Sequence, residues 1–487
     1  MLDYEAVIGV EVHAELETQS KMFCACPVVD VTQAEPNSAI CPVCTGMPGV
    51  LPVVNRRAVE YALRVALALE CEIAPVSIFA RKNYFYPDLP KGYQISQYEY
   101  PLARHGRMSI LTSDGEQVIG IRRVHLEEDT GKLSHVGRDG QGYSLIDFNR
   151  AGVPLLEIVT EPDLHSAEAV RAYAMALRSL LRYLGVNSGD MQKGILRIEP
   201  NISVRRLGSQ TFGTRVEIKN LNSFRVLERS VAYEIQRQTE ALEKGQRIIQ
   251  ETLGWDEERE ATVTQRVKEQ EDDYRYFPEP DLPPLTIEPV WIEQVRQGLP
   301  ELPYAKYQRF QVQYGLGPYD AEVLTAEKEV ADYFEQVSAE ARQASPKVVA
   351  NWITGELFGL LNQAGQDITS LRVSPPSLAE LIQLVVRGEI NQNSAKLVLE
   401  EMFASGEPPA AIVTRRNLSQ ISDQAAIAGL VSQVLKDNPA QVESYLGGKE
   451  PILKWLFGRV MQAARGRANP QVIQQELERQ LAARKDG

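Results

Sequence analysis

A strict alternation of apolar and polar side chains near the N-terminus constrains the fold of this chain more than any other feature. In residues 7–16 the polar positions Glu11, His13 and Glu15 are separated by single apolar residues. Successive side chains of a β-strand point to opposite faces, so the three polar groups would share one face. The run therefore predicts a strand whose apolar face anchors it to a core. Its polar face is either a solvated surface of an antiparallel sheet or part of a metal or acid/base site.

Four of the five cysteines form two close pairs, Cys24 with Cys26 and Cys41 with Cys44, and 14 residues separate the pairs. This spacing is typical of a zinc knuckle, in which four thiolates surround Zn²⁺, and free thiols are the alternative. Four sulfur ligands leave no position for a substrate, so such a site would support folding rather than catalysis. Cys71 stands in an apolar helical pattern and is expected to be an ordinary buried residue.

The composition is that of an ordinary soluble protein. A chain of 487 residues has room for about two to four domains, and 44% hydrophobic residues can bury a core in each. No apolar stretch is long enough to cross a bilayer, and the first residues do not resemble a signal peptide, so we expect a cytoplasmic location and no membrane partner. The net charge of −13 means that any contact with nucleic acid must come from a local basic surface.

Strand-like runs dominate the sequence up to about residue 290. Such runs cover residues 117–124, 195–205 and 214–219, and helical stretches occur near 56–69 and 165–183. Long helices do not regularly separate the strands, as they would in a parallel sheet. We therefore predict an α+β class with a mainly antiparallel sheet.

From about residue 301 the composition changes to alanine, leucine, glutamate, glutamine and valine at helical spacing. Proline-rich turns at 374–377 and 406–409 interrupt this part of the chain. We expect three domains, at residues 1–293, 294–406 and 410–487, of which the second and third are all-helical.

Two further acidic clusters lie at residues 125–129 and 155–163. Glu157 is flanked by apolar residues, and a buried carboxylate requires a partner or a cation. Together with Glu11 and His13 it could form an oxygen-rich Mg²⁺ site that leaves positions for water and substrate phosphates. The alternative is a set of ion pairs with nearby arginines: Arg122, Arg123 and Arg150.

Five longer motifs carry a resemblance to a known family. They are residues 7–13 (Val-Ile-Gly-Val-Glu-Val-His), 81–88 (Arg-Lys-Asn-Tyr-Phe-Tyr-Pro-Asp), 93–97 (Tyr-Gln-Ile-Ser-Gln), 217–224 (Glu-Ile-Lys-Asn-Leu-Asn-Ser-Phe) and 272–281 (Asp-Asp-Tyr-Arg-Tyr-Phe-Pro-Glu-Pro-Asp). With these motifs the chain resembles the B subunits of bacterial tRNA-dependent amidotransferases, from its first strand to the Ala-Asn-Pro at 468–470. Motifs of this length in the same order are far more specific than a single fingerprint.

The resemblance implies an ATP-dependent ligase that converts Glu-tRNA(Gln) to Gln-tRNA(Gln), or Asp-tRNA(Asn) to Asn-tRNA(Asn). Members of the family phosphorylate the side-chain carboxylate of the misacylated amino acid with ATP and Mg²⁺. Ammonia from an amidase-type A subunit then displaces phosphate, and a small C subunit completes the complex. The first domain would be the catalytic one, with a sheet similar to that of glutamine synthetase and with structural Zn²⁺ on the four cysteines.

The resemblance also assigns roles to individual residues. The Mg²⁺ ligands would be Glu11, His13, Glu128 and Glu157, and the catalytic residues Glu128, Lys82 and Lys91. Strand alternation places Glu127 with His125 on one face and Glu128 on the other, and cannot decide between the two carboxylates. The family favours Glu128. The two lysines would line the ammonia route or face the site, although exposed lysines are common.

The tail is the local basic surface that an acidic tRNA-binding chain requires. Between residues 449 and 487 it has eight lysines or arginines and four acidic residues, with Arg459, Arg465 and Arg467 close together. Such a surface suits tRNA phosphates, whereas an ordinary solvated helix is the alternative. The family uses this tail to contact tRNA.

One segment departs from the family pattern. The usual Leu-Arg-Cys-Asp-Val-Asn segment has isoleucine, Glu199 and Pro200 at its third to fifth positions. The longer carboxylate would change any metal or nucleotide contact at this point.

The alternative function is that of a non-catalytic, zinc-containing tRNA-binding scaffold. No glutaminase nucleophile is visible, so a self-sufficient glutamine-using ligase is not expected.

Overall fold

The computed structural model describes residues 3–137, 142–267, 274–420, 424–464 and 468–485. The chain divides into two compact units, Met1–Ala305 and Lys306–Gly487. Within the described residues, the first unit contains all the strands, and the named elements of the second unit are helices. The predicted α+β class, with a helical C-terminal region, is confirmed.

A nine-stranded sheet forms the centre of the first unit, in the order β14-β13-β12-β11-β1-β10-β7-β6-β2. Neighbouring strands are antiparallel except for β12 and β13, which are parallel. The strands are β1 (Tyr4–Glu15), β2 (Glu72–Ile73), β6 (Ala103–Thr112), β7 (Gly115–Glu128), β10 (Pro154–Thr160), β11 (Leu196–Arg206), β12 (Val216–Lys219), β13 (Glu251–Asp256) and β14 (Ala261–Val267).

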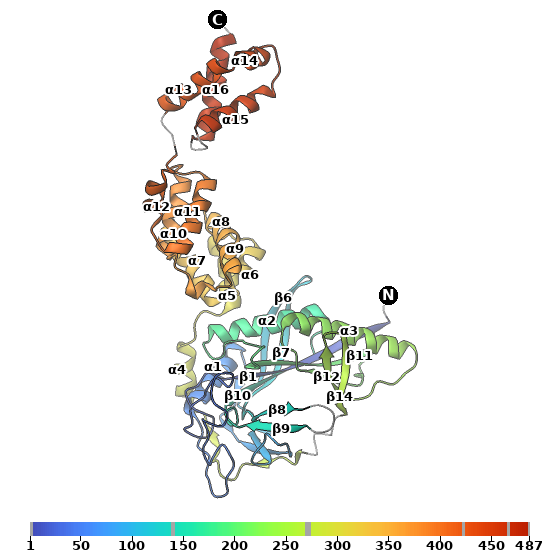
Figure 1. Cartoon of the computed structure of the whole chain (residues 1–487). Helices are drawn as coiled ribbons and strands as arrows, with labels where there is room; N and C mark the ends of the chain where they lie inside the picture. Colours follow the sequence, from blue (N-terminus) through green and yellow to red (C-terminus); the bar gives the residue numbers. More distant parts are fainter. Residues whose placement is uncertain (1–2, 138–141, 268–273, 421–423, 465–467, 486–487) are drawn as a thin grey trace. The chain divides into compact units, whose positions relative to one another are not determined.

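Two helices, α2 (Ala167–Tyr183) and α3 (Phe224–Glu243), lie along one face of this sheet (Figure 1). The apolar residues of β1, among them Val10 and Val12, point to this face and are completely buried. Helix α2 begins where the sequence indicates, because the Ser166 side chain accepts a hydrogen bond from the Ala169 backbone N–H. The helices thus leave the opposite, polar face of the sheet for other elements.

Smaller elements complete the first unit. They are three small sheets, of β4 (Ala80–Asn83), β5 (Tyr93–Ser96) and β15 (Phe277–Pro278), of β3 (Val76–Ser77) and β16 (Leu285–Thr286), and of β8 (Lys132–Val136) and β9 (Tyr143–Asp147), with helices α1 (Arg56–Ala68) and α4 (Pro289–Gln297). Figure 1 shows β8 and β9 on the side of the main sheet opposite α2 and α3. Strand β5 contacts β7 and brings its neighbour β4 towards the acidic end of β7.

The second unit has two separate hydrophobic cores, one formed between residues 310 and 413 and one between 427 and 481. Its helices are α5 (Pro303–Tyr314), which begins in the first unit, α6 (Pro318–Thr325), α7 (Lys328–Glu340), α8 (Pro346–Asn351), a π-helix (Trp352–Leu357), α9 (Phe358–Ala364), a 3₁₀ turn (Ile368–Ser370), α10 (Pro375–Val386), α11 (Gln392–Ser405), α12 (Pro409–Arg416), α13 (Gln424–Asp437), α14 (Pro439–Leu446), α15 (Ile452–Ala463) and α16 (Pro470–Lys485). None of the described helices has the length and apolar character needed to span a membrane.

Tyr173 of α2 is completely buried, and its hydroxyl has no hydrogen-bond partner among the described residues. A buried hydroxyl without a partner costs free energy, so Tyr173→Phe is expected to raise the free energy of unfolding by about 1 kcal/mol. The matched core variant Leu177→Ala should lower it by about 3 kcal/mol. Urea denaturation of the full chain measures both changes. A loss of stability in Tyr173→Phe would mean that the hydroxyl is satisfied.

Candidate catalytic site

Antiparallel pairing brings polar residues of three strands together on the open face of the sheet. His13 lies opposite Glu157 of β10, and Glu157 lies opposite His125 of β7. The His13 Nε2 atom is 3.4 Å from Glu157 Oε2 and 3.6 Å from Glu127 Oε1. Ligand atoms of His13, Glu127 and Glu157 all lie within 4.8 Å of one another, as the ligands of one metal ion would.

His13, Glu127 and Glu157 are called the first group below. The charges around His13 keep its imidazole positively charged when no metal is bound. Burial alone disfavours the imidazolium, but hydrogen bonding to Glu157 and the charges of Glu157, Glu199 and Glu127 outweigh it and raise the pKa of His13 to about 9. A metal ion would therefore have to displace a proton from His13 before the ring could act as a ligand.

Arginines also contact this acidic region. Arg123 Nη2 lies 3.6 Å from Glu157 Oε1, whereas Arg122 pairs with Glu161 and Arg150 lies near Asp129. The expected ion pair to Glu157 therefore exists with one of the three arginines. A second oxygen of Glu157 still faces the two histidines. The arginine contact and a cation site on Glu157 are compatible.

The structure places Glu128, one of the predicted metal ligands, outside this group. Its carboxylate accepts hydrogen bonds from Lys91 Nζ and from the Ile95 backbone N–H, the latter at 2.9 Å. The physical reason is strand alternation: Glu127 shares the face of His125 and Glu157, and its neighbour points away. The structure brings Glu128 together with Lys91, and puts Glu127 with His13 and Glu157.

Lys82 of β4 lies among tyrosine rings, near enough to Glu127 and Glu157 to interact with their charges. Its Nζ lies 5.2 Å from the ring centroid of Tyr274 and 6.0 Å from that of Tyr84. Burial favours the neutral amine, but Tyr276 and the carboxylates of Glu127 and Glu157 outweigh it and raise the pKa of Lys82. The lysine is therefore a fixed positive charge beside the two carboxylates.

Glu11 of β1 belongs to a second group, together with Glu199 of the neighbouring strand β11 and Glu217 of β12. Carboxylate oxygens of Glu11, Glu199 and Glu217 lie within 4.8 Å of one another. Burial and the charges of Glu157, Glu217 and Glu199 raise the pKa of Glu11, as expected where carboxylates are crowded without a cation. The predicted set of Glu11, His13 and Glu157 is thus divided between two adjacent groups on the same face.

Neutral donors orient two of these three carboxylates. Asn201 Nδ2 donates to Glu11 Oε1 at 3.1 Å, and Thr252 Oγ1 donates to Glu217 Oε2 at 3.0 Å. Hydrogen bonds of this kind, from neutral groups to a carboxylate, are usual around metal ligands.

Glu15, the third polar residue of the first strand, joins a different network. Burial and the nearby charge of Asp129 raise the pKa of Glu15 to about 8, so it is largely protonated at neutral pH. Asp129 in turn accepts a 2.8 Å hydrogen bond from Arg197. This network supports the strand ends and brings no further carboxylate into the two groups.

Several residues of the site were not among the sequence-based candidates. They are His125, Asn201, Glu217 and Lys219. Arg123 and Glu127 had been named only as alternatives, and Glu199 was set aside. Alternation alone indicates that Glu217 and Lys219 share a face of their strand. The pairing that brings that face to Glu11 is a property of the sheet register and not of any local motif.

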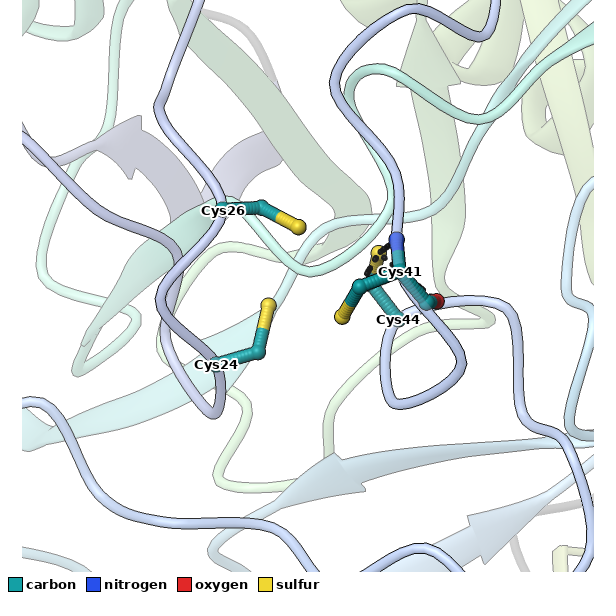
Figure 2. Close-up of side chains that lie close together, drawn as sticks. All are labelled: Cys24, Cys26, Cys41 and Cys44. Carbon is teal, nitrogen blue, oxygen red and sulfur yellow. Dashed lines mark hydrogen bonds between the residues drawn. The ribbon is translucent and has the colours of Figure 1, made fainter.

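The four cysteines are close together, as Figure 2 shows. All four are free of disulfides, and their sulfurs lie within 4.8 Å of one another. Cys41 and Cys44 have a sulfur–sulfur distance of 3.9 Å. Zinc–sulfur bonds of about 2.3 Å in a tetrahedron place the sulfurs about 3.8 Å apart, so the arrangement fits a four-thiolate zinc centre.

A buried lysine lies against this centre. Lys21 is completely buried, and its Nζ is 3.6 Å from Cys44 Sγ and 3.2 Å from the Phe148 carbonyl oxygen. No carboxylate pairs with Lys21 in the described structure, and a buried ammonium requires a negative partner. Four thiolates on one Zn²⁺ carry a net negative charge and would supply that partner, whereas neutral thiols would not.

Comparison with known proteins identifies the family of the chain. The family model described as the GatB/GatE catalytic domain matches residues 6–293, and the GatB domain model matches residues 332–481. The chain belongs to the GatB family. The B subunit of the aspartyl/glutamyl-tRNA(Asn/Gln) amidotransferase of Moorella thermoacetica is 54% identical over 480 residues, which cover 99% of this chain and 100% of that protein.

Two further GatB relatives with the same name are similar over their whole length. The protein of Carboxydothermus hydrogenoformans is 50% identical over 483 residues, covering 99% of this chain and 100% of its own. That of Thermomicrobium roseum is 51% identical over 480 residues, covering 99% of both chains.

Of the three tail arginines predicted to contact tRNA, the structure describes Arg459. Arg459 is exposed on α15, where its guanidinium lies 5.7 Å from the ring centroid of Trp455, which is also exposed. Arg465 and Arg467 lie outside the described residues.

If the four cysteines bind zinc, the charge of the buried Lys21 should contribute to the zinc affinity. Lys21→Met keeps the length of the side chain and removes its charge, so it should weaken zinc binding by about 10- to 100-fold, the range typical of groups that support metal ligands. Competition with a chromophoric chelator measures the affinity. Lys193→Met, which removes an exposed lysine paired with Asp30, is the control. Equal zinc affinity in both variants would exclude charge compensation by Lys21.

We expect substitutions of the two neighbouring carboxylates of β7 to have different effects on metal binding. Glu127→Gln should weaken Mn²⁺ binding by about tenfold, because it removes a charged ligand beside His13 and Glu157. Glu128→Gln should leave Mn²⁺ binding unchanged, because Glu128 contacts Lys91 instead. Electron paramagnetic resonance of free Mn²⁺ measures both. The reverse pattern would restore Glu128 as the ligand.

Proposed function

We propose that this chain is the B subunit of a tRNA-dependent amidotransferase, an enzyme that converts Glu-tRNA(Gln) to Gln-tRNA(Gln) or Asp-tRNA(Asn) to Asn-tRNA(Asn). The observation that carries the proposal is the polar face of the sheet, with two adjacent groups of oriented carboxylates. The names of the full-length relatives support the same substrate class.

The proposed reaction has two steps on one site. A carboxylate oxygen of the misacylated amino acid attacks the γ-phosphorus of ATP, and the bond to the β–γ bridging oxygen breaks, so that ADP leaves. Ammonia then attacks the activated acyl carbon, and phosphate leaves with the bonding electrons as the amide forms. The surplus proton of ammonia passes to a base or to water. Charge develops on phosphate oxygens in the first step, and fixed positive charges stabilise it.

The carboxylate groups fit divalent cations of the kind that accompany ATP. When bound, Mg²⁺ neutralises charge on the transferring phosphoryl group. His13, Glu127 and Glu157 would hold one ion, and Glu11, Glu199 and Glu217 would hold a second, with water and phosphate oxygens in the remaining positions. Glu128 remains a candidate catalytic residue through its contact with Lys91 and not as a ligand.

The two predicted lysines have different places in this proposal. Lys82 faces Glu127 and Glu157 and would stabilise negative charge on the acyl group. Lys91 is held by Glu128 and lies beside the loop of the cysteine quartet, whose Gly46 packs against it. We assign Lys91 to the route by which ammonia from the partner subunit reaches the site. Zn²⁺ on the cysteines has a structural role.

The remaining parts of the proposal concern domains and partners. Residues 1–293 would form the catalytic domain, with a sheet that presents carboxylates to metal-bound nucleotide as in glutamine synthetase. Residues 294–406 would form a helical domain, and 410–487 a tail that contacts tRNA through Arg459, Arg465 and Arg467. An amidase-type A subunit and a small C subunit would complete the enzyme in the cytoplasm, where aminoacyl-tRNA is used.

The kinase step is tested by Glu11→Gln in the complete enzyme. The variant should lose about 100-fold or more in ATP turnover while it binds tRNA normally, because it removes a metal ligand and no tRNA contact. Radiolabelled Glu-tRNA and Asp-tRNA, with ATP, Mg²⁺ and ammonium chloride, report amide formation and show which substrate is used. Glu70→Gln, in an exposed pair with Arg107, is the matched control.

Two outcomes would contradict this assignment. Unchanged ATP turnover in Glu11→Gln would exclude Glu11 as a metal ligand. A wild-type enzyme that binds tRNA but consumes no ATP would favour the scaffold function, with the acidic groups as structural ion pairs.

A further inference from the structure

Arg123 of β7 has an unsatisfied guanidinium beside the first group. Its Nε atom is buried and has no hydrogen-bond acceptor among the described residues. Nη2 lies 3.6 Å from Glu157 Oε1, a distance that allows an ion pair but is too long for a hydrogen bond. A buried N–H without an acceptor costs free energy. The guanidinium is therefore held next to the acids with a donor that remains available to a ligand.

A β-bulge places two consecutive arginines at this point of the sheet. The pairing of β7 with β10 shifts by one residue between Val159 and Thr160, which makes Arg122 an extra residue of β7. Bulges are common next to active sites, where they change the direction of a side chain. The register of the sheet thus has an irregularity at the residue that precedes Arg123.

The two arginines at the bulge have different surroundings. Arg122 donates two hydrogen bonds to Glu161 Oε2, at 2.7 and 3.1 Å, and its side chain is 56% exposed. The side chain of Arg123 is 29% exposed, and that of Glu157 beside it is 8% exposed. Arg122 thus forms a surface ion pair, whereas Arg123 connects the solvent with the buried acids of the first group.

A second buried nitrogen next to Glu157 also lacks a partner. His125 contacts Glu157 Oε2 through Nε2 at 3.2 Å, but its Nδ1 atom has no hydrogen-bond partner among the described residues. The side chain of His125 is 3% exposed, so bulk water does not relieve the cost of this unpaired atom. Two unpaired nitrogens beside one carboxylate indicate that a ligand and its bound waters complete this site.

The balance of charge indicates the kind of ligand. When a metal ion is bound, His13 is a neutral ligand. Two cations, Lys82 and Arg123, then offset the two carboxylates of the first group. The charge of the metal ion itself is left over, so the site as a whole attracts an anion. A triphosphate, with several charged oxygens, has the chemistry to supply it.

We propose that Arg123 contacts the oxygens of the γ-phosphate of ATP and is a catalytic residue of the phosphoryl-transfer step. The inference rests on the proposed function, because it requires metal-bound ATP at the first group. A guanidinium stays charged and binds two phosphate oxygens at once through parallel N–H donors. While the bond between the γ-phosphorus and the bridging oxygen breaks, the peripheral oxygens remain negatively charged, and Arg123 stabilises that charge.

Nucleotide affinities test this contact, because the γ-phosphate distinguishes ATP from ADP. In the complete enzyme with Mg²⁺, Arg123→Gln should bind the non-hydrolysable β,γ-imido analogue of ATP about tenfold more weakly. Its affinity for ADP should stay within about twofold of wild type. Arg123→Lys keeps the charge but loses the paired donors, so it should recover part of the lost affinity. Isothermal titration calorimetry measures each value.

Arg122→Gln is the matched control. It removes the same charge from the neighbouring position, together with the exposed pair to Glu161. Both nucleotides should bind to this variant as they bind to wild type. Equal losses of affinity for the imido analogue in Arg122→Gln and Arg123→Gln would mean a general effect of positive charge and would overturn a direct contact.

Turnover and metal binding separate a catalytic role from a structural one. Arg123→Gln should lower kcat for ATP turnover by at least about 100-fold and raise KM for ATP by at most about tenfold, because the contact stabilises the transition state most. The affinity for Mn²⁺, followed by electron paramagnetic resonance, should not fall. Weaker Mn²⁺ binding with equal losses for both nucleotides would show that Arg123 only positions Glu157, and would overturn the proposal.

The outcomes also separate this inference from the proposed function. If the wild-type enzyme binds the imido analogue and turns over ATP, and Arg123→Gln does both equally well, the γ-phosphate contact is overturned and the proposed function stands. A wild-type enzyme that binds neither nucleotide and consumes no ATP would overturn the proposed function, and this inference with it.

Discussion

The pairing of β1 with β10 on one side and β11 on the other is the interaction on which the site depends. In this register His13 lies opposite Glu157, and Glu11 lies opposite Glu199. Because side chains alternate, a shift of either strand by one residue would turn its polar groups to the face covered by α2 and α3. The apolar residues between them fix the register, since they are completely buried against the helices.

This arrangement concentrates negative charge on one face, and the two carboxylate groups are balanced differently. Around Glu127 and Glu157 the structure already places three positive charges, those of His13, Lys82 and Arg123. In the group of Glu11, Glu199 and Glu217, Lys219 pairs with Glu199 and Glu217. Crowded carboxylates that are partly desolvated are stable only with a cation or a proton, and the raised pKa of Glu11 shows the same strain.

The sequence contained most of the fold but only part of the site. Alternation and helix caps indicated the first strand, α2 and the change to an all-helical region, because these depend on local chemistry. The choice of Glu128 over Glu127 as a metal ligand stays a prediction, and the structure places Glu127, which shares a face with His125, beside His13 and Glu157. What the sequence lacked was the register that sets His125 opposite Glu157. The same is true of Glu217 and Lys219, whose nearness to Glu11 arises from strands about 200 residues apart in the chain.

The cysteine centre has no open coordination position, yet it is not remote from the chemistry. Gly46 in its loop has a left-handed backbone, and a Cβ atom at this position would overlap Lys91 Cγ. Lys91 in turn holds the carboxylate of Glu128, which also accepts the Ile95 backbone N–H. The loop thus fixes one wall of the site through direct packing. A zinc ion on the four cysteines would fold only its own loop, yet that loop packs against Lys91, and the four thiolates would balance the buried charge of Lys21.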